Sequence, residues 1–241
     1  MKLIKITGYN LIEFLRQPIY WVTTMLFPSM FFWFFGVPNA NEQSSALMLV
    51  TSFAAFGCLT VMLFQMAVQI AHERELSWSR YMRTLPINSL VVLGAKVLAS
   101  LTLALFAILT VFVVGALSTQ IDYTDVPVFK LIFAMLAGVI PFGLLGISIG
   151  YTVKGNAAVP LANMVHLPLS FAGGLWLPPN ALPKVIQNIS EYLPTRAYAE
   201  ILWAIAFKKE IAIKNIYYLL GYFVVFLAAT IVLYKRNQSK Y

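Results

Sequence analysis

The sequence predicts an all-α polytopic membrane protein with six transmembrane helices. Of its 241 residues, 60% are hydrophobic and only 11% are charged. The mean hydropathy of +0.79 is far above that of soluble globular domains. The apolar residues gather into runs long enough to cross a bilayer, which takes about 20 residues of helix. We therefore expect a single membrane domain that covers residues 1–241.

The net charge of +8 would suggest nucleic-acid binding in a soluble protein. Here the basic residues stand beside the apolar runs, which is the arrangement that membrane topology produces. We therefore expect the lipid bilayer, and no nucleic acid, as the partner of these charges.

Residues 1–18 should form an interfacial helix that lies on the membrane and does not cross it. Apolar residues such as Leu11 fall on one side of this helix, and charged residues such as Arg16 fall on another. This pattern is typical of amphipathic helices at the membrane surface. Pro18 would end the helix.

Six apolar runs follow, and each should span the membrane once. Pro28 should kink the first span, because proline removes one backbone hydrogen bond. Pro160 and Pro168 should break or bend the fifth span, which is tolerated only where protein or a water-filled cavity satisfies the freed backbone groups. The expected spans are residues 19–37, 45–71, 90–117, 128–153, 157–177 and 216–234.

The densest cluster of charge lies between the second and third spans, at residues 72–86, HERELSWSRYMRTLP. Charges of this kind must lie in water on one side of the membrane. Wound as a helix, the segment separates an apolar face from a polar one, so we predict a short amphipathic helix on the membrane surface. The apolar face would consist of Trp78, Tyr81, Met82 and Leu85. The polar face would include Glu73, Ser77, Arg80 and Thr84, and Pro86 would end the helix.

Residues 178–213 lie between the fifth and sixth spans. Their apolar stretches are too short to cross the membrane, yet the segment is too apolar for a free loop. Prolines interrupt their apolar stretches. We predict two re-entrant half-helices that dip into one leaflet. The residues that mark this region are Gly173, Gly174, Pro178, Pro183 and Pro194.

Six spans place both termini on the same side of the membrane. That side gathers a large excess of lysine and arginine, whereas acids and bases balance on the other side. The positive-inside rule then predicts that both termini and the 72–86 helix are cytoplasmic, and that the prolyl segment is extracellular.

The chain lacks the sequence motifs of several enzyme classes. It has no Walker A loop for nucleotide phosphates and no G-x-S-x-G nucleophile elbow. The string HEREL begins like a zinc-protease motif, but Leu76 stands where the second histidine ligand is required. We expect no catalytic residue, no bound metal and no cofactor on this chain. His166 could titrate or touch a substrate, but a hydrogen bond within the helix bundle is the favoured explanation.

Two strings resemble a known family. They are ERE at 73–75, followed by Leu85 and Pro86, and PLSFAGGLWLPPNALPKVIQNISEYLPTRAYAE at 168–200. They are similar to the permease subunit of the ABC type-2 exporters, the family of daunorubicin-resistance-type and polysaccharide-exporting permeases. The resemblance covers the whole chain, although the family commonly has Gly where this chain has Ser77.

The resemblance implies a plasma-membrane protein of bacterial type that docks on a separate ATPase, which would hold ATP and Mg²⁺. The 72–86 segment would be the coupling helix. Its contact residues would be Glu73, Arg74, Glu75, Trp78, Arg80, Tyr81, Met82, Arg83, Leu85 and Pro86. A second copy or a paralogue would complete the transporter.

The substrate path would run between the Phe-rich first span and the fifth span, and its lining suits a hydrophobic or amphiphilic substrate such as a drug, an antibiotic or a lipid-like molecule. The candidate lining residues are Phe31, Phe34, Phe35, Asn163 and His166. Two alternatives stay open: a channel or scaffold without ATP coupling, and a membrane-embedded lipid-modifying enzyme.

Overall fold

The computed structural model describes residues 2–16, 26–76 and 89–238. All regular structure in these ranges is helical, and residues 26–31 form a helical turn that leads into the first π-helix. In the first half of the chain the elements are α1 (Lys2–Arg16), η1 (Phe32–Gly36), η2 (Val37–Asn39), α3 (Gln43–Leu59), η3 (Thr60–Gln65), α4 (Met66–Glu75) and α6 (Ser89–Ser118). In the second half they are α7 (Val128–Gly138), α8 (Ile140–Thr152), α9 (Gly155–Ala172), η4 (Pro179–Ala181), α10 (Lys184–Ser190), α11 (Pro194–Ala206) and α12 (Ile213–Gln238).

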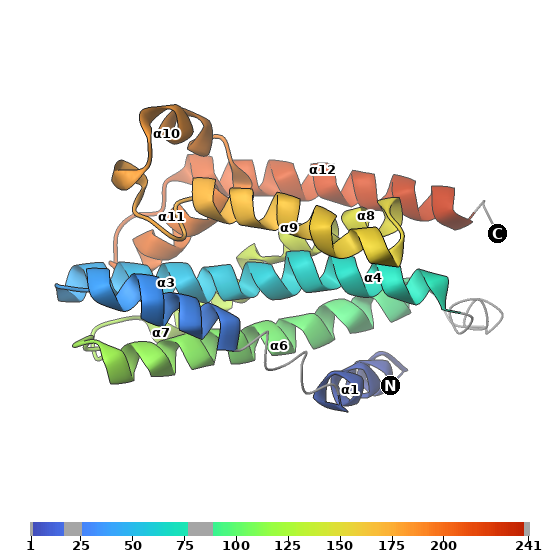
Figure 1. Cartoon of the computed structure of the whole chain (residues 1–241), viewed down its shortest axis with the longest axis horizontal. Helices are drawn as coiled ribbons and strands as arrows, with labels where there is room; N and C mark the ends of the chain where they lie inside the picture. The colour runs from blue at the N-terminus through green and yellow to red at the C-terminus, as the bar shows by residue number, and fades with distance from the viewer. Residues whose placement is uncertain (1, 17–25, 77–88, 239–241) are drawn as a thin grey trace.

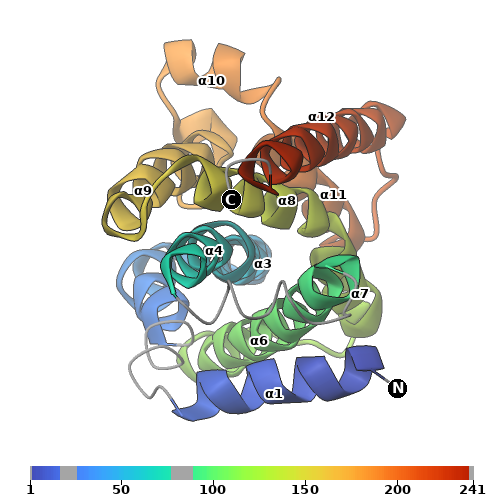
Figure 2. The same cartoon turned by 90° about the vertical axis from the view of Figure 1, so that its right-hand side faces the viewer.

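The long helix formed by α3, η3 and α4 is the centre of the bundle. It runs without a break over Gln43–Glu75, and 89% of its most apolar stretch is buried. Figure 2 shows α8 and α9 on one side of it and α6 on the other. Since nearly every face of this helix touches protein, its residues are apolar all round instead of amphipathic.

Within the described residues, four helices are long and apolar enough to cross a membrane: Gln43–Glu75, Val91–Ser118, Val128–Thr152 and Ile213–Asn237. They correspond to the predicted second, third, fourth and sixth spans. The predicted first span begins outside the described residues and continues through 26–31 into η1. Helix α9 covers most of the predicted fifth span but is not among the four, so the count of six stays a prediction.

Proline affects the helices differently from the prediction. Helix α9 continues from Gly155 to Ala172 with Pro160 and Pro168 inside it, so these prolines do not break it. The helical pair α7 and α8 is interrupted instead at Val139, which precedes Pro141. The first turn of a helix has no intrahelical acceptor for its N–H groups, so proline is well tolerated there.

The prolyl segment forms three short elements at one end of the bundle, η4, α10 and α11 (Figure 1). Helix α11 is mostly buried, whereas α10 is largely exposed. Pro194 is the first residue of α11 and Pro183 immediately precedes α10. The prolines therefore start helices here, and re-entry into a leaflet stays a prediction.

The two ends of the bundle differ in what they hold. Helix α4 ends at the same end as the C-terminus of α12 and the N-terminus of α9, and α1 lies across the bundle beside α6 (Figures 1 and 2). We call this the charged end, defined by Glu73, Arg74, Lys96 and Asn237. The opposite end, with α10 and α11, is the pocket end, defined by Glu191, Arg196 and Glu200.

Candidate functional site

Arg74 joins three helices at the charged end. Its guanidinium donates to the carbonyl of Gly150 at 2.7 Å and to that of Val153 at 3.4 Å, at the C-terminus of α8. It also donates to the Asn237 side chain on α12 at 2.5 Å and lies 5.5 Å from the Tyr151 ring centre. The last carbonyls of a helix lack intrahelical donors and carry partial negative charge. Arg74 therefore caps α8 while it ties α4 to α12.

Asn237 completes this joint. Its side-chain amide donates to the carbonyl of Tyr151 at 3.1 Å and to that of Leu233 at 2.9 Å, so one amide group serves two helices. The Asn237 side chain is buried although it lies near the C-terminus. A buried polar group of this kind costs free energy unless it is paired, and here both its donor and its acceptor are used.

Glu73 forms an ion pair with Lys96 of α6. Lys96 is only 8% exposed, so its side chain does not reach freely into water. A lysine in a membrane span is tolerated where a partner neutralises it. The pair connects α4 to α6, so the first two residues of the ERE string join α4 to three neighbouring helices.

Glu75 is exposed and ends α4. It lies beside the start of α9, since a side-chain carbon added at Gly155 would come within 2.8 Å of both the Glu75 carboxylate and the His72 ring. Leu76 then adopts an extended conformation. The structure differs here from the prediction of one helix over 72–86: the ERE string is the last turn of the second span.

The other predicted coupling residues lie outside the described ranges. These are Trp78, Arg80, Tyr81, Met82, Arg83, Leu85 and Pro86, and their role stays a prediction. Of the predicted ATPase contacts, Glu73, Arg74 and Glu75 are described. Glu73 and Arg74 are engaged within the chain, whereas Glu75 is exposed.

Two of the predicted path residues, Phe31 and His166, belong to one aromatic cluster because both contact Phe56. Phe56 of α3 stacks on the His166 ring with 5.1 Å between centres, and on Phe31 with 5.9 Å. Trp176 lies 5.5 Å from Phe31. The His166 Nε2 atom is 3.4 Å from the hydroxyl of Thr60 in the π-helical η3, which agrees with the favoured expectation of a histidine bonded within the bundle. A π-helical turn such as η3 often marks a functional site.

Of the three further path residues, Phe35 lies at the edge of this cluster, whereas Phe34 and Asn163 do not join it. Phe34 and Phe35 are more than half exposed on η1, and Asn163 is half-buried on α9. The Phe35 ring lies 5.4 Å from Phe31, at the edge of the cluster. The structure therefore groups Phe31 with His166 and leaves Phe34 facing outward.

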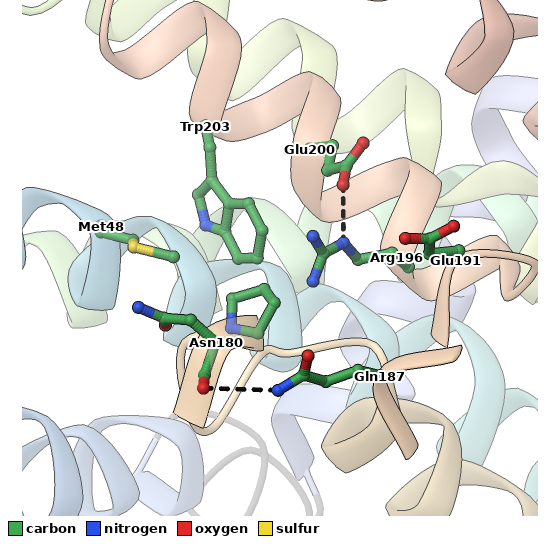
Figure 3. A pocket seen from close by; sticks show the side chains of 8 residues that line it. Met48, Asn180, Gln187, Glu191, Arg196, Glu200 and Trp203 are labelled. Atoms are coloured by element: carbon green, nitrogen blue, oxygen red, sulfur yellow. Dashed lines mark hydrogen bonds and ion pairs between the residues drawn. The ribbon is translucent and has the colours of Figure 1, made fainter. Parts of the chain in front are cut away.

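A pocket of about 450 Å³ opens at the pocket end (Figure 3). Helix α3 contributes Met48, the η4–α10 segment contributes Pro179, Asn180 and Gln187, and α11 with the residues before it contributes Glu191, Arg196, Glu200 and Trp203. Arg196 donates through Nε to Glu200 at 2.7 Å and lies 5.5 Å from the Trp203 ring centre. The Trp203 indole donates to Ser52 at 2.9 Å.

Glu200 is held in its charged form. Burial raises the pKa of this carboxyl, but hydrogen bonds from Arg196 and Asn215 and the charges of Arg196 and Lys214 outweigh it, so the pKa lies below its ordinary value. The Asn215 amide, at the start of α12, donates to Glu200 at 2.7 Å. Glu200 thus links α11 to α12 and fixes the position of Arg196.

Glycine and proline shape the connection to this pocket. Gly174 has φ of +81°, a conformation that favours glycine. A side-chain carbon at Gly173 would come within 2.5 Å of the Thr195 hydroxyl. The predicted markers Gly173, Gly174, Pro178, Pro183 and Pro194 all lie in this connection, although none lines the pocket.

Sequence reasoning missed the residues that line the pocket, together with Lys96 and Asn237. Trp203 and Ser52 are 151 positions apart, and Arg74 and Asn237 are 163 apart. No local pattern signals such pairs. A weak signal did exist for Arg196 and Glu200, because opposite charges four residues apart share a helix face. Within the described ranges, no three His, Cys, Asp or Glu side chains lie close enough together to hold a metal ion.

Comparisons with known proteins match nearly the whole chain. The model of a family described as ABC-2 family transporter protein matches residues 10–232. A protein of Bacillus subtilis (strain 168), provisionally named transport permease YvfS, is 24% identical over 232 residues, which are 93% of this chain and 94% of YvfS. No solved structure was found to match the chain.

Proposed function

Because this chain belongs to the ABC-2 family of transporter proteins, we propose that it is the transmembrane permease subunit of an ATP-binding cassette exporter. It moves a hydrophobic or amphiphilic substrate out of the cell with ATP that a separate subunit hydrolyses. The observation that carries the proposal is the family match over residues 10–232 of a chain without a Walker A loop. In this proposal, the energy comes from a separate ATPase subunit.

The ATPase docks at the charged end in this proposal. The segment 72–86 receives the motion of the ATPase, and Arg74 and Glu73 pass it to α8, α12 and α6 through the hydrogen bonds and the ion pair described above. A helix end that is bonded to three neighbours moves with them as a unit, as rigid-body transport motions require. Glu75, which is exposed, is the described residue best placed to contact the ATPase directly.

Two copies of this chain, or this chain and a paralogue, enclose the substrate path. Phe34 and Phe35 provide an exposed, aromatic surface beside Phe31 that suits a hydrophobic or amphiphilic substrate, and the buried Phe56 and His166 support it from behind. Both termini and the charged end lie in the cytoplasm, in line with the excess of basic residues there. The pocket end then faces the outside of a bacterial plasma membrane.

Affinity purification of the full chain from its native membrane in mild detergent, with mass spectrometry of the bound proteins, tests the proposal. We expect an ABC-type ATPase in about equal amount. Glu75→Arg should weaken this association, whereas Glu191→Gln, at the pocket end, should leave it unchanged. Purification of the chain without any nucleotide-binding protein would contradict the proposal and favour a channel or a membrane scaffold.

A further inference from the structure

We propose that the pocket lined by Arg196 and Trp203 is a binding site for an anionic ligand, one that carries a carboxylate or phosphate group on an apolar body. The site goes beyond the proposed transport function. Its ability to bind does not depend on ATP, and only the side from which the ligand arrives rests on the proposed orientation.

Arg196 provides the anion-binding group. Its Nε is bonded to Glu200, but no hydrogen bond engages its two terminal amino groups within the part of the chain that the structure describes. The side chain is only 17% exposed. Figure 3 shows the guanidinium lined up beside Trp203, with Asn180 and Gln187 on the other side of the hollow. An arginine held through Nε presents two parallel N–H donors, which is the geometry that binds a carboxylate or phosphate in two places.

The arginine is held in this orientation before any ligand arrives. Glu200 fixes one edge of the guanidinium, and Asn215 in turn fixes Glu200. The Trp203 ring lies against the guanidinium, and the indole is itself anchored to Ser52. Binding of a ligand therefore costs little conformational entropy of the arginine, and this preorganisation increases the affinity for the ligand.

The rest of the lining favours a ligand with an apolar part. Met48 and the Trp203 ring, which is 9% exposed, provide apolar surface, and the volume of about 450 Å³ falls within the range of about 300–1,000 Å³ for small-molecule sites. The amide of Gln187 is bonded to the carbonyls of Leu182 and Asn180 at 2.6 and 3.4 Å, so it holds the wall of the pocket in place. A small inorganic anion would leave most of this surface unused.

Glu191 limits the charge that the site accepts. This exposed carboxylate also lines the pocket and forms no ion pair with Arg196 among the described residues. It repels anions, so the site favours a single negative charge over a multiply charged ligand. Removal of this carboxylate should therefore strengthen binding, an effect of opposite sign to that of removing Arg196.

Titration calorimetry on the purified full chain in a non-ionic detergent tests the site. The probes are indole-3-acetate, its neutral relative indole-3-acetamide, inorganic phosphate, and short-chain phosphatidylglycerol. We expect the two amphiphilic anions to bind more tightly than the amide and the inorganic phosphate. Preference for phosphatidylglycerol would identify a lipid headgroup as the ligand, and preference for indole-3-acetate would identify a small organic acid.

Four variants distinguish binding in this pocket from non-specific attraction of anions to the basic protein. Arg196→Gln should weaken binding of the preferred anion by about tenfold or more, as expected for a charge-assisted hydrogen bond. Arg196→Lys keeps the positive charge but loses the two parallel N–H donors of the guanidinium. Its affinity for the anion should lie between those of Arg196→Gln and the wild type. Glu191→Gln should strengthen binding about twofold, and Lys184→Gln, an exposed residue that does not line the pocket, should have no effect.

Equal affinity for the acid and the amide would overturn the site, and so would an equal loss in the Lys184 and Arg196 variants. Because Glu191 is exposed, its variant should fold even if replacement of Arg196 does not. No change, or a loss of affinity, in Glu191→Gln would also overturn the site. None of these outcomes alters the ATPase co-purification, so failure of the site is distinct from failure of the proposed function.

Discussion

Arg74 and Arg196 are the same side chain at opposite ends of the bundle, and they differ in how their donors are used. Arg74 donates through both terminal nitrogens to carbonyls of α8 and to Asn237. Arg196 donates through Nε to Glu200 on its own helix, and among the described residues its terminal nitrogens donate to no group. Both lie 5.5 Å from an aromatic ring centre. An arginine whose terminal nitrogens bond other helices builds a joint, and one whose terminal nitrogens face a pocket can bind a ligand.

The two arginines should differ most in how much their replacement lowers the free energy of unfolding. Arg74→Gln should lower the free energy of unfolding by about 1–3 kcal/mol, because it leaves carbonyls at the end of α8 and the Asn237 side chain without their donor. The matched variant Arg196→Gln removes an i,i+4 ion pair and should cost less than about 1 kcal/mol. Thermal unfolding of the two purified variants measures this, and equal losses would contradict the comparison.

The Glu73–Lys96 ion pair should show coupling of intermediate size. Lys96→Met leaves the Glu73 carboxylate without its partner, and Glu73→Gln leaves the buried ammonium without its partner. The double variant should therefore be more stable than the sum of the two single losses predicts, by about 1 kcal/mol. A double-mutant cycle on thermal unfolding checks this, and additive losses would show that the pair does not join α4 to α6.

The smallest effect should be the pH dependence of the pocket end. Since the pKa of Glu200 is lowered on folding, its charged form adds stability at neutral pH. That contribution is lost as the pH falls below the ordinary carboxyl pKa and through the lowered one. Glu200→Gln should therefore reduce the loss of melting temperature as the pH is lowered from neutral to well below the ordinary glutamate pKa of about 4.3. An unchanged pH profile in this variant would contradict the role of Glu200.

The sequence was sufficient to predict the all-helical class, and four of the six predicted spans coincide with apolar helices of the described residues, because long apolar runs determine both. It also marked Glu73 and Arg74 as unusual, because charge beside an apolar run is costly. It did not predict their partners Lys96 and Asn237, which depend on how distant helices pack. The prolines of α9 led us to expect a broken or bent helix, and the helix is continuous through both of them. Proline removes one hydrogen bond, and the packed bundle tolerates that loss.

The residues of the pocket were also beyond sequence reasoning. Arg196 and Glu200 fall on one helix face, but only the fold brings Met48 and Gln187 next to them. The same limit applies to the aromatic cluster. Phe31 and His166 were predicted as path residues, yet Phe56, which touches both, lies in an unremarkable apolar run.

The central claim is that the charged end and the pocket end lie on opposite sides of the membrane. Single cysteines test it most directly, since the native Cys58 is buried, whereas Asn180 and Lys154 are exposed at the two ends. With a membrane-impermeant thiol reagent, we predict that Asn180→Cys is labelled in intact cells and Lys154→Cys only after lysis. Labelling of Lys154→Cys in intact cells, or of Asn180→Cys only after lysis, would contradict the account.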